Sequence, residues 1–173
     1  MFKKISFSLL AVLLGFGVTL AALYFWRNSG GAQKKPESNL IGGKLPPANL
    51  SATGGEKFSG EDLLKGKVLI MFLSADCEAC NAEIRQMAEM YPQISSQIQV
   101  YGINVDPKEK QNALAENKNI NFPLLTDEKR EFAASLSVKG VPTKFLIEDG
   151  IIKKVFLGRF IDKTDARQKL ELP

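Results

Sequence analysis

Two cysteines separated by two residues, Cys77 and Cys80, are the only cysteines in this chain of 173 residues. When a C-x-x-C sequence occupies the first turn of a helix, its two sulfurs come within disulfide distance. The partial positive charge of the helix N-terminus also favours the thiolate form of the first cysteine. We therefore expect Cys77 to be an exposed nucleophile and Cys80, one turn further in, to resolve mixed disulfides.

The chain contains no histidine, which excludes Ser-His-Asp and Cys-His catalysis and any histidine-ligated metal site. A closed zinc site needs about four ligands, and the two cysteines supply only half of them. A structural disulfide closing so short a ring would constrain little of the unfolded chain. Two unrelated buried thiols are a third alternative, but a strand followed by C-x-x-C and a helix favours redox chemistry.

The segments on either side of the cysteines have the patterns of a strand and a helix. Lys67–Ser74 is a continuous apolar run, which predicts a central strand covered on both faces. A helix is expected to begin near Cys77 and to end before Pro92. Its buried stripe follows the i, i+3, i+4, i+7 spacing and consists of Ile84, Met87, Ala88 and Tyr91.

The rest of the chain alternates strand and helix patterns and ends in a hairpin and a helix. Asp106 is expected to cap a helix with Pro107 at its first position. The expected elements are a hairpin over 50–58, a helical turn over 59–64 with Ser59 at its N-cap, a strand over 99–105, helices over 108–117 and 127–135, strands over 143–147 and 151–157, and a helix over 162–170. This order predicts an α/β fold, with a mixed central sheet, helices on both faces and an N-terminal β-hairpin.

The N-terminal segment differs from the rest, because Ile5–Trp26 contains no charged residue. At about 1.5 Å per residue it is long enough to cross a hydrocarbon core of about 30 Å, so we expect one transmembrane helix. A cleaved signal peptide is the alternative, although its apolar region is usually only about 7–15 residues long. The predicted organisation is a membrane anchor (1–27), a flexible linker (28–39) and one domain (40–173).

The net charge of the chain is +4, and three of its positive charges lie in the anchor at Lys3, Lys4 and Arg27. The remaining chain carries a net charge of only +1, so no basic surface for nucleic acid is expected. Positive charges flank the apolar segment on both sides and do not decide its orientation. Export of the domain is the simpler assumption, because the N-terminal tail is very short.

Two stretches resemble the thioredoxin superfamily. Residues 66–80 (GKVLIMFLSADCEAC) are similar to its active-site stretch, and residues 138–147 (VKGVPTKFLI) are similar to its cis-proline loop and the following strand. The apolar N-terminus, the N-terminal hairpin and the segment 122–127 resemble the membrane-anchored TlpA/ResA-like branch with its redoxin (AhpC/TSA-like) domain. The resemblance covers about residues 42–162.

The resemblance implies roles for individual residues. Cys77 would be the attacking thiol, and Cys80 the resolving thiol. Val141, Pro142 and Thr143 would form the substrate-binding loop, with a cis peptide between Val141 and Pro142. ResA-like proteins often carry a glutamate three residues beyond the second cysteine. Glu83 occupies this position, where it would take the proton of Cys80; an ordinary solvated helix carboxylate is the alternative. No cofactor is implied other than the redox-active disulfide itself.

The chain departs from the family pattern around the cysteines. Ser74-Ala75-Asp76 replaces the usual tryptophan segment, and Met71 stands where cytosolic thioredoxins have a buried aspartate. Asp76 and Glu78 place negative charge next to Cys77, which opposes the helix dipole and disfavours its thiolate. A less stabilised reduced form is a weaker oxidant, so a reductase is expected.

The sequence therefore predicts a membrane-tethered thiol–disulfide oxidoreductase on the extracytoplasmic side. Its partners would be disulfide-containing exported proteins, with apocytochrome c as one substrate class, and a membrane dithiol electron donor. Two alternatives are a thiol peroxidase of the peroxiredoxin type and a metal-binding assembly module. The segment before Cys77 lacks the threonine and proline typical of the first, and the absence of histidine disfavours the second.

Overall fold

The computed structural model describes residues 39–52, 56–117 and 120–173. The predicted anchor, nearly all of the predicted linker and the expected turn at 53–55 lie outside these residues. Within the described ranges, none of the helices has the length and apolar character needed to cross a membrane. The expected transmembrane segment, Ile5–Trp26, lies outside the described residues.

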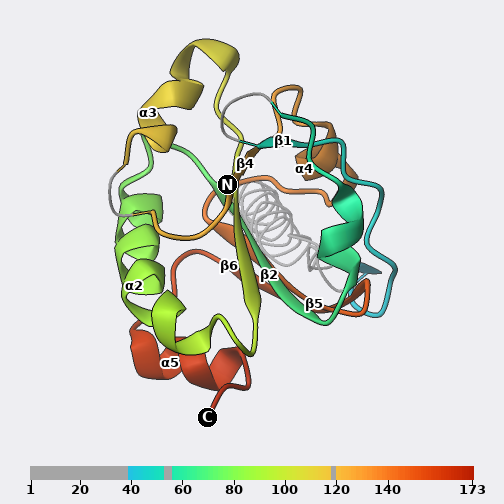
Figure 1. Cartoon of the computed structure of the whole chain (residues 1–173), viewed down its shortest axis with the longest axis vertical. Helices are drawn as coiled ribbons and strands as arrows, with labels where there is room; N and C mark the ends of the chain where they lie inside the picture. The colour runs from blue at the N-terminus through green and yellow to red at the C-terminus, as the bar shows by residue number, and fades with distance from the viewer. Residues whose placement is uncertain (1–38, 53–55, 118–119) are drawn as a thin grey trace, which may run out of the picture. The chain divides into compact units, whose positions relative to one another are not determined.

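A mixed sheet of six strands forms the centre of the domain (Figure 1), with the order β1-β4-β3-β2-β5-β6. Strand β2 pairs in parallel with β3 and antiparallel with β5, so it lies in the middle of the sheet. The strands are β1 (Ser51–Ala52), β2 (Lys67–Leu73), β3 (Gln99–Asn104), β4 (Leu124–Thr126), β5 (Thr143–Glu148) and β6 (Ile151–Leu157). The predicted central strand and mixed sheet are confirmed.

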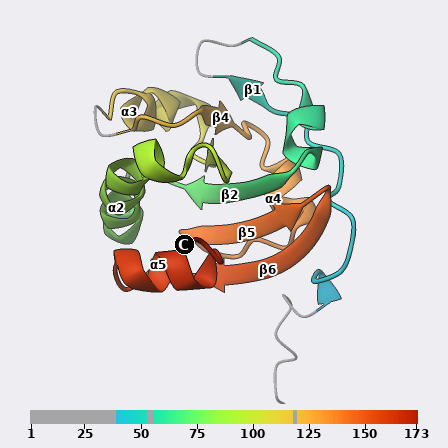
Figure 2. The ribbon, with the colours of Figure 1, turned by 60° about the horizontal axis from the view of Figure 1, so that its bottom comes forward.

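Helices cover both faces of the sheet, as expected from the sequence. They are η2 (Gly60–Leu64), α2 (Glu78–Ile94), η3 (Lys108–Lys110), α3 (Gln111–Ala115), α4 (Glu131–Ser135) and α5 (Lys163–Lys169). Figure 2 shows α2 and α5 close together on one side of the sheet, where Arg167 of α5 donates to Gln93 of α2.

Strand β2 contributes to two separate cores, because successive side chains of a strand point to opposite faces. Leu69 and Met71 pack in the core that includes α2 and Phe160. Ile70 and Phe72 pack in the opposite core, which includes Phe132 of α4. All six residues of β2 after Lys67 are fully buried, as the apolar run predicted.

Helix α2 begins after Cys77, as predicted, but the prediction that it ends before Pro92 is wrong. Pro92 lies inside the helix, which continues to Ile94. A proline lacks the N–H that would bond to the carbonyl four residues earlier, here that of Ala88. The side chain of Asn121 donates to this carbonyl at 2.9 Å. A tertiary contact therefore satisfies the acceptor that Pro92 leaves free.

The predicted role of Asp106 as a helix cap is also wrong. Pro107 occupies the N-cap position of η3, and the expected helix over 108–117 consists of the short η3 and α3. Ser59 is the N-cap residue of η2, as predicted, but its side chain makes no capping hydrogen bond. The helix expected over 127–135 begins only at Glu131. The carboxylate of Asp127 nevertheless accepts from the backbone N–H groups of the first turn of α4.

Near the N-terminus of the domain, Ser51 forms an isolated antiparallel bridge with Lys57, and β1 pairs with β4. The predicted hairpin between β5 and β6 is present. Its turn uses Asp149 and Gly150, whose φ angles are 48° and 75°. The helix expected over 162–170 is present as α5, and Asp162 caps it by accepting from Asp165 N–H.

Candidate active site

Cys77 and Cys80 form a disulfide at the N-terminus of α2, with their Cα atoms 5.1 Å apart. Cys77 is the N-cap residue, and its sulfur accepts from the backbone N–H of Cys80 at 3.0 Å. Cys77 is partly exposed, whereas Cys80 is fully buried. The structure thus gives the two sulfurs unequal access to solvent, with the first one reachable and the second one behind it.

The turn that connects β2 to Cys77 is held by Asp106, which follows β3. One oxygen of this buried carboxylate accepts from the hydroxyl of Ser74, and the other accepts from Ala75 N–H at 2.8 Å. Asn104 in turn accepts from Asp106 N–H at 2.9 Å. Because β2 and β3 are parallel neighbours, Asp106 reaches the end of β2 and fixes the backbone that enters the active-site helix.

Replacing Asp106 by alanine is expected to lower the free energy of unfolding by about 1–3 kcal/mol, because the partly buried hydroxyl of Ser74 and N–H of Ala75 lose their acceptor. Urea denaturation of the oxidised protein measures this loss. Asp62→Ala is the matched control, since the Asp62 side chain is 52% exposed and forms a surface ion pair with Lys65. That control should change stability by no more than about 1 kcal/mol; equal losses in both variants would contradict the role of Asp106.

The negative charge of Asp76 beside Cys77 is balanced in the structure. Lys110 of η3 forms an ion pair with the Asp76 carboxylate, and this hydrogen bond raises the pKa of Lys110. The exposed Glu78 is therefore the acidic residue next to Cys77 whose charge has no ion-pair partner within the described part of the chain.

The loop before β5 lies against the first cysteine. The Val141–Pro142 peptide bond is cis, and the Val141 carbonyl oxygen is 3.6 Å from the Cys77 sulfur. Val141 is partly exposed, whereas Thr143 is buried and its hydroxyl donates to the Gly140 carbonyl at 2.6 Å. Of the three predicted loop residues, Val141 thus presents its backbone next to the sulfur, and Thr143 uses its side chain to close the loop.

Glu83 is not the solvated helix carboxylate that the sequence left as an alternative, because its side chain is fully buried. Its Oε2 lies 3.1 Å from the ammonium of Lys144 on β5 and accepts from Phe160 N–H at 2.7 Å. Lys144 is equally buried and also donates to the Gly158 carbonyl at 2.6 Å. A buried ion pair thus lies between α2 and β5.

Burial dominates the titration of this pair. Desolvation raises the pKa of Glu83, although the charge of Lys144 and the hydrogen bond from Phe160 act in the opposite direction. Desolvation likewise lowers the pKa of Lys144 despite the nearby carboxylate. Each partner is therefore the main group that keeps the other one ionised.

Lys144 was not among the site residues predicted from the sequence. The signal was present, because Lys144 interrupts the apolar run of β5 in the sequence TKFLI. A lysine is almost never fully buried unless it is paired, so this position implied a buried acidic partner. The identity of that partner depends on how α2 packs on the sheet.

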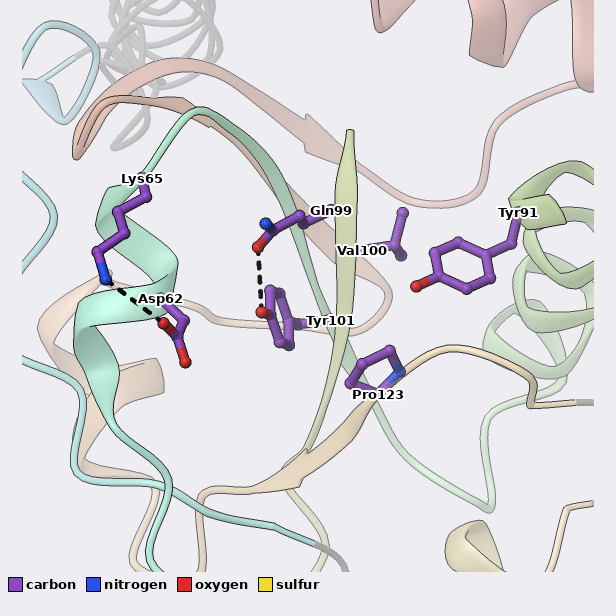
Figure 3. A pocket seen from close by; sticks show the side chains of 7 residues that line it. All are labelled: Asp62, Lys65, Tyr91, Gln99, Val100, Tyr101 and Pro123. Atoms are coloured by element: carbon purple, nitrogen blue, oxygen red, sulfur yellow. Dashed lines mark hydrogen bonds and ion pairs between the residues drawn. The ribbon is translucent and has the colours of Figure 1, made fainter. Parts of the chain in front are cut away.

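A pocket of about 330 Å³ lies elsewhere in the domain, around the beginning of β3 (Figure 3). In it the Tyr101 hydroxyl donates to Gln99, and Asp62 pairs with Lys65. Gln99 and Tyr101 lie opposite Val68 and Ile70 in the parallel register. Cys77 follows the other end of β2, so this pocket does not belong to the site of the cysteines.

Comparison with known proteins agrees with this site. The model of the AhpC/TSA family matches residues 41–155. The chain is 29% identical to the thiol-disulfide oxidoreductase ResA of Geobacillus thermodenitrificans, over 94% of this chain and 90% of that protein. It is 32% identical to ResA of Bacillus subtilis, over 70% of each.

Among solved structures, a protein assigned as the thiol:disulfide interchange protein DsbE from Chlorobium tepidum superposes with a TM-score of 0.66. It is 24% identical in sequence, and the match covers 76% of this chain and 94% of that one. This likeness shows the thioredoxin-like fold. Together with the matching family model, the similarity to ResA and the disulfide at the start of α2, it leads to one conclusion: the chain belongs to the AhpC/TSA family and is a thiol–disulfide oxidoreductase of the ResA type.

Proposed function

We propose that this protein is a membrane-tethered reductase that exchanges the Cys77/Cys80 dithiol with disulfides of exported proteins. The observation that carries the proposal is the arrangement at the start of α2. A partly exposed sulfur sits at the helix N-terminus, bonded to a buried sulfur and 3.6 Å from the Val141 carbonyl.

In this proposal the reduced protein reacts in two steps. The Cys77 thiolate attacks the substrate disulfide and forms a mixed disulfide, while an extended substrate segment pairs with the backbone of Val141 beside Pro142. Cys80 then attacks the Cys77 sulfur, which releases the second substrate thiol and forms the Cys77–Cys80 disulfide. Glu83 takes the proton of Cys80 in this second step, which is consistent with its burial three residues further along α2.

The proposed membrane tether is Ile5–Trp26, within an anchor over 1–27, followed by a linker over 28–39 and the catalytic domain over 40–173. In support, the similarity to ResA of Geobacillus thermodenitrificans covers 94% of the chain and so extends into this apolar segment. The domain would lie on the extracytoplasmic side, where protein disulfides persist. A membrane dithiol protein would return electrons to the site, and apocytochrome c would be one of its substrates.

A reductase needs a disulfide that is hard to reduce, and we expect a reduction potential below about −180 mV, nearer to the roughly −270 mV of thioredoxin. The unbalanced charge of Glu78 beside Cys77 disfavours the thiolate and so the reduced form. Equilibration in glutathione or dithiothreitol buffers, followed by quantification of free thiols, measures this potential. A value near −120 mV, typical of a dedicated oxidase, would contradict the proposed direction.

Trapping tests the proposed function directly. In the Cys80→Ser variant Cys77 can still attack, but the mixed disulfide cannot resolve, so substrates should remain covalently bound. We expect exported proteins, apocytochrome c among them, to be recovered from native membranes that contain the full-length variant. The Cys77→Ser/Cys80→Ser variant is the control and should retain none. Capture of cytosolic proteins alone would contradict the proposed compartment.

The same variant separates this proposal from a thiol peroxidase. A peroxidase whose reaction needs only Cys77 would consume peroxide in the Cys80→Ser variant, whereas the proposed reductase would not. The reductase should instead reduce protein disulfides only when both cysteines are present.

A further inference from the structure

Lys144 is fully buried, and three groups surround its ammonium. The ammonium lies 3.1 Å from Glu83 Oε2, donates to the Gly158 carbonyl at 2.6 Å, and lies 3.9 Å from the centre of the Phe160 ring. The ring face adds a favourable interaction with the cation. This site holds a charged lysine inside the domain, at the considerable cost of desolvating it.

The two oxygens of Glu83 have different surroundings. Oε2 accepts from both Lys144 and the backbone N–H of Phe160. Oε1 is also buried, and it has no hydrogen-bond partner among the described residues. A buried carboxylate oxygen without a partner is unfavourable for stability and calls for a functional explanation. Oε1 is the oxygen of this ion pair that remains available to take a proton.

The ion pair joins the two elements that carry the reactive groups. Glu83 lies three residues after Cys80 on α2, so the two buried side chains share a face of the helix. Lys144 lies two residues after Pro142, in the strand that follows the loop touching Cys77. Cys80 and the Phe160 that covers the pair belong to the same core.

We propose that Lys144 is a positioning residue for the exchange reaction, which holds Glu83 by Oε2 and keeps its carboxylate ionised so that Oε1 can accept the proton of Cys80. The inference rests on the proton-acceptor role of Glu83 in the proposed function. In the step concerned, the proton moves from Cys80 Sγ to Glu83 Oε1, and the resulting thiolate attacks Cys77. The Cys77–Cys80 bond forms, and the substrate sulfur leaves with the electron pair of the broken bond.

Other charged groups among the described residues also act on the pair. Arg159, in the exposed segment after β6, acts to lower the pKa of the Glu83 carboxyl group. Lys169 and Asp165 of α5 act on Lys144 with opposite signs. Lys144 is the strongest of the groups that favour the ionised form of Glu83.

Without Lys144, burial of Glu83 would be opposed by the hydrogen bond from Phe160 and the charge of Arg159, but no longer by the strongest of these groups. The pKa of Glu83 would rise further, and at neutral pH more of the carboxyl group would be protonated and unable to accept a proton. Resolution of the mixed disulfide should therefore slow at neutral pH and recover as the pH is raised. A lysine with a purely structural role would change stability without moving this pH profile.

The reaction of the reduced full-length protein with dithiobis(nitrobenzoate) separates the two steps. Attack by Cys77 releases one equivalent of nitrothiobenzoate, and attack by Cys80 releases the second one. In Lys144→Met we expect the rate of the first release to be unchanged and the rate of the second release to be about tenfold lower at neutral pH. This decrease corresponds to a shift of about one pH unit in the pH profile of the second release. Lys153→Met is the matched control on neighbouring β6, because the Lys153 side chain is 46% exposed, and it should leave both steps unchanged.

A double-mutant cycle with Glu83→Gln shows whether Lys144 acts through Glu83. We expect Lys144→Met to cause no further slowing once Glu83 is glutamine. An unchanged second release in Lys144→Met, or equal slowing with and without Glu83, would overturn the inference. If Glu83→Gln itself left the second release unchanged, the proton-acceptor role in the proposed function would fail. If the reduced wild-type protein released no first equivalent of nitrothiobenzoate, this result would instead contradict exchange at Cys77 altogether.

Two further substitutions separate charge from packing. Lys144→Gln retains a hydrogen-bond donor for Glu83 but removes the charge, so it should slow the second release as Lys144→Met does. If Lys144→Met does not fold, Lys144→Gln provides the same test. Lys144→Arg retains the charge and should keep a pH profile close to that of the wild type. Fast resolution in Lys144→Gln would overturn the inference.

Discussion

Replacing Glu83 by alanine is expected to lower the free energy of unfolding by about 3–5 kcal/mol, because it leaves the buried ammonium of Lys144 without its carboxylate. Chemical denaturation of the oxidised protein measures the loss. Glu89→Ala is the matched control on the same helix, since Glu89 is 61% exposed and pairs with Lys163 at the surface. It should lower stability by no more than about 1 kcal/mol.

The loss in Glu83→Ala should also depend on pH. Burial already lowers the pKa of Lys144, and removal of Glu83 takes away the main group that raises it. The folded variant then releases a proton at a lower pH than the unfolded chain does. Its stability should therefore rise as the pH increases from this lowered pKa towards the ordinary lysine value of 10.5. A loss as small as that of Glu89→Ala, or one that grows with pH, would contradict the buried ion pair.

Replacing Cys77 by serine is expected to lower the rate of disulfide reduction by about a thousandfold or more, to the background rate, because the nucleophile is lost. Reduction of insulin disulfides in the presence of dithiothreitol measures this turnover. Cys80→Ser should also lose turnover, but for another reason: its Cys77 still reacts once and then remains in a mixed disulfide.

Alkylation of the reduced protein checks the assignment of the two thiols. Cys77 is partly exposed at a helix N-terminus, whereas Cys80 has no exposed surface. Iodoacetamide at neutral pH should therefore modify Cys77 first, and mass spectrometry of peptides identifies the modified residue. Faster modification of Cys80 than of Cys77 would contradict the proposed order of attack.

Several features of the fold could be predicted because they depend on local sequence. The apolar run over β2 has too few polar residues for a surface strand, and the turn at Asp149-Gly150 uses residues that tolerate positive φ. The start of α2 at Cys77 was predicted for the same reason. Its end was not, because the helix passes Pro92 with the help of Asn121, which is distant in the chain.

Asp106 is a second position at which the prediction from local sequence was wrong. An aspartate before a proline is a common helix start, so local sequence favoured a cap. The parallel register of β2 and β3 brings Asp106 to Ser74 and Ala75 instead, and there its two oxygens accept from two partly buried donors. No local pattern identifies the partner of a carboxylate that bonds to a neighbouring strand.

The chemistry of the site follows from local sequence, because two cysteines at this spacing between a buried strand and a helix lie within disulfide distance wherever the helix packs. How the site is held depends on contacts between segments that are distant in the chain. Whether Glu83 faced water or a buried cation depended on the packing of α2 against β5, and on the segment that brings Phe160 over both charges. The free energy of a buried charge is set by its neighbours in space, and most of these neighbours are far away in the sequence.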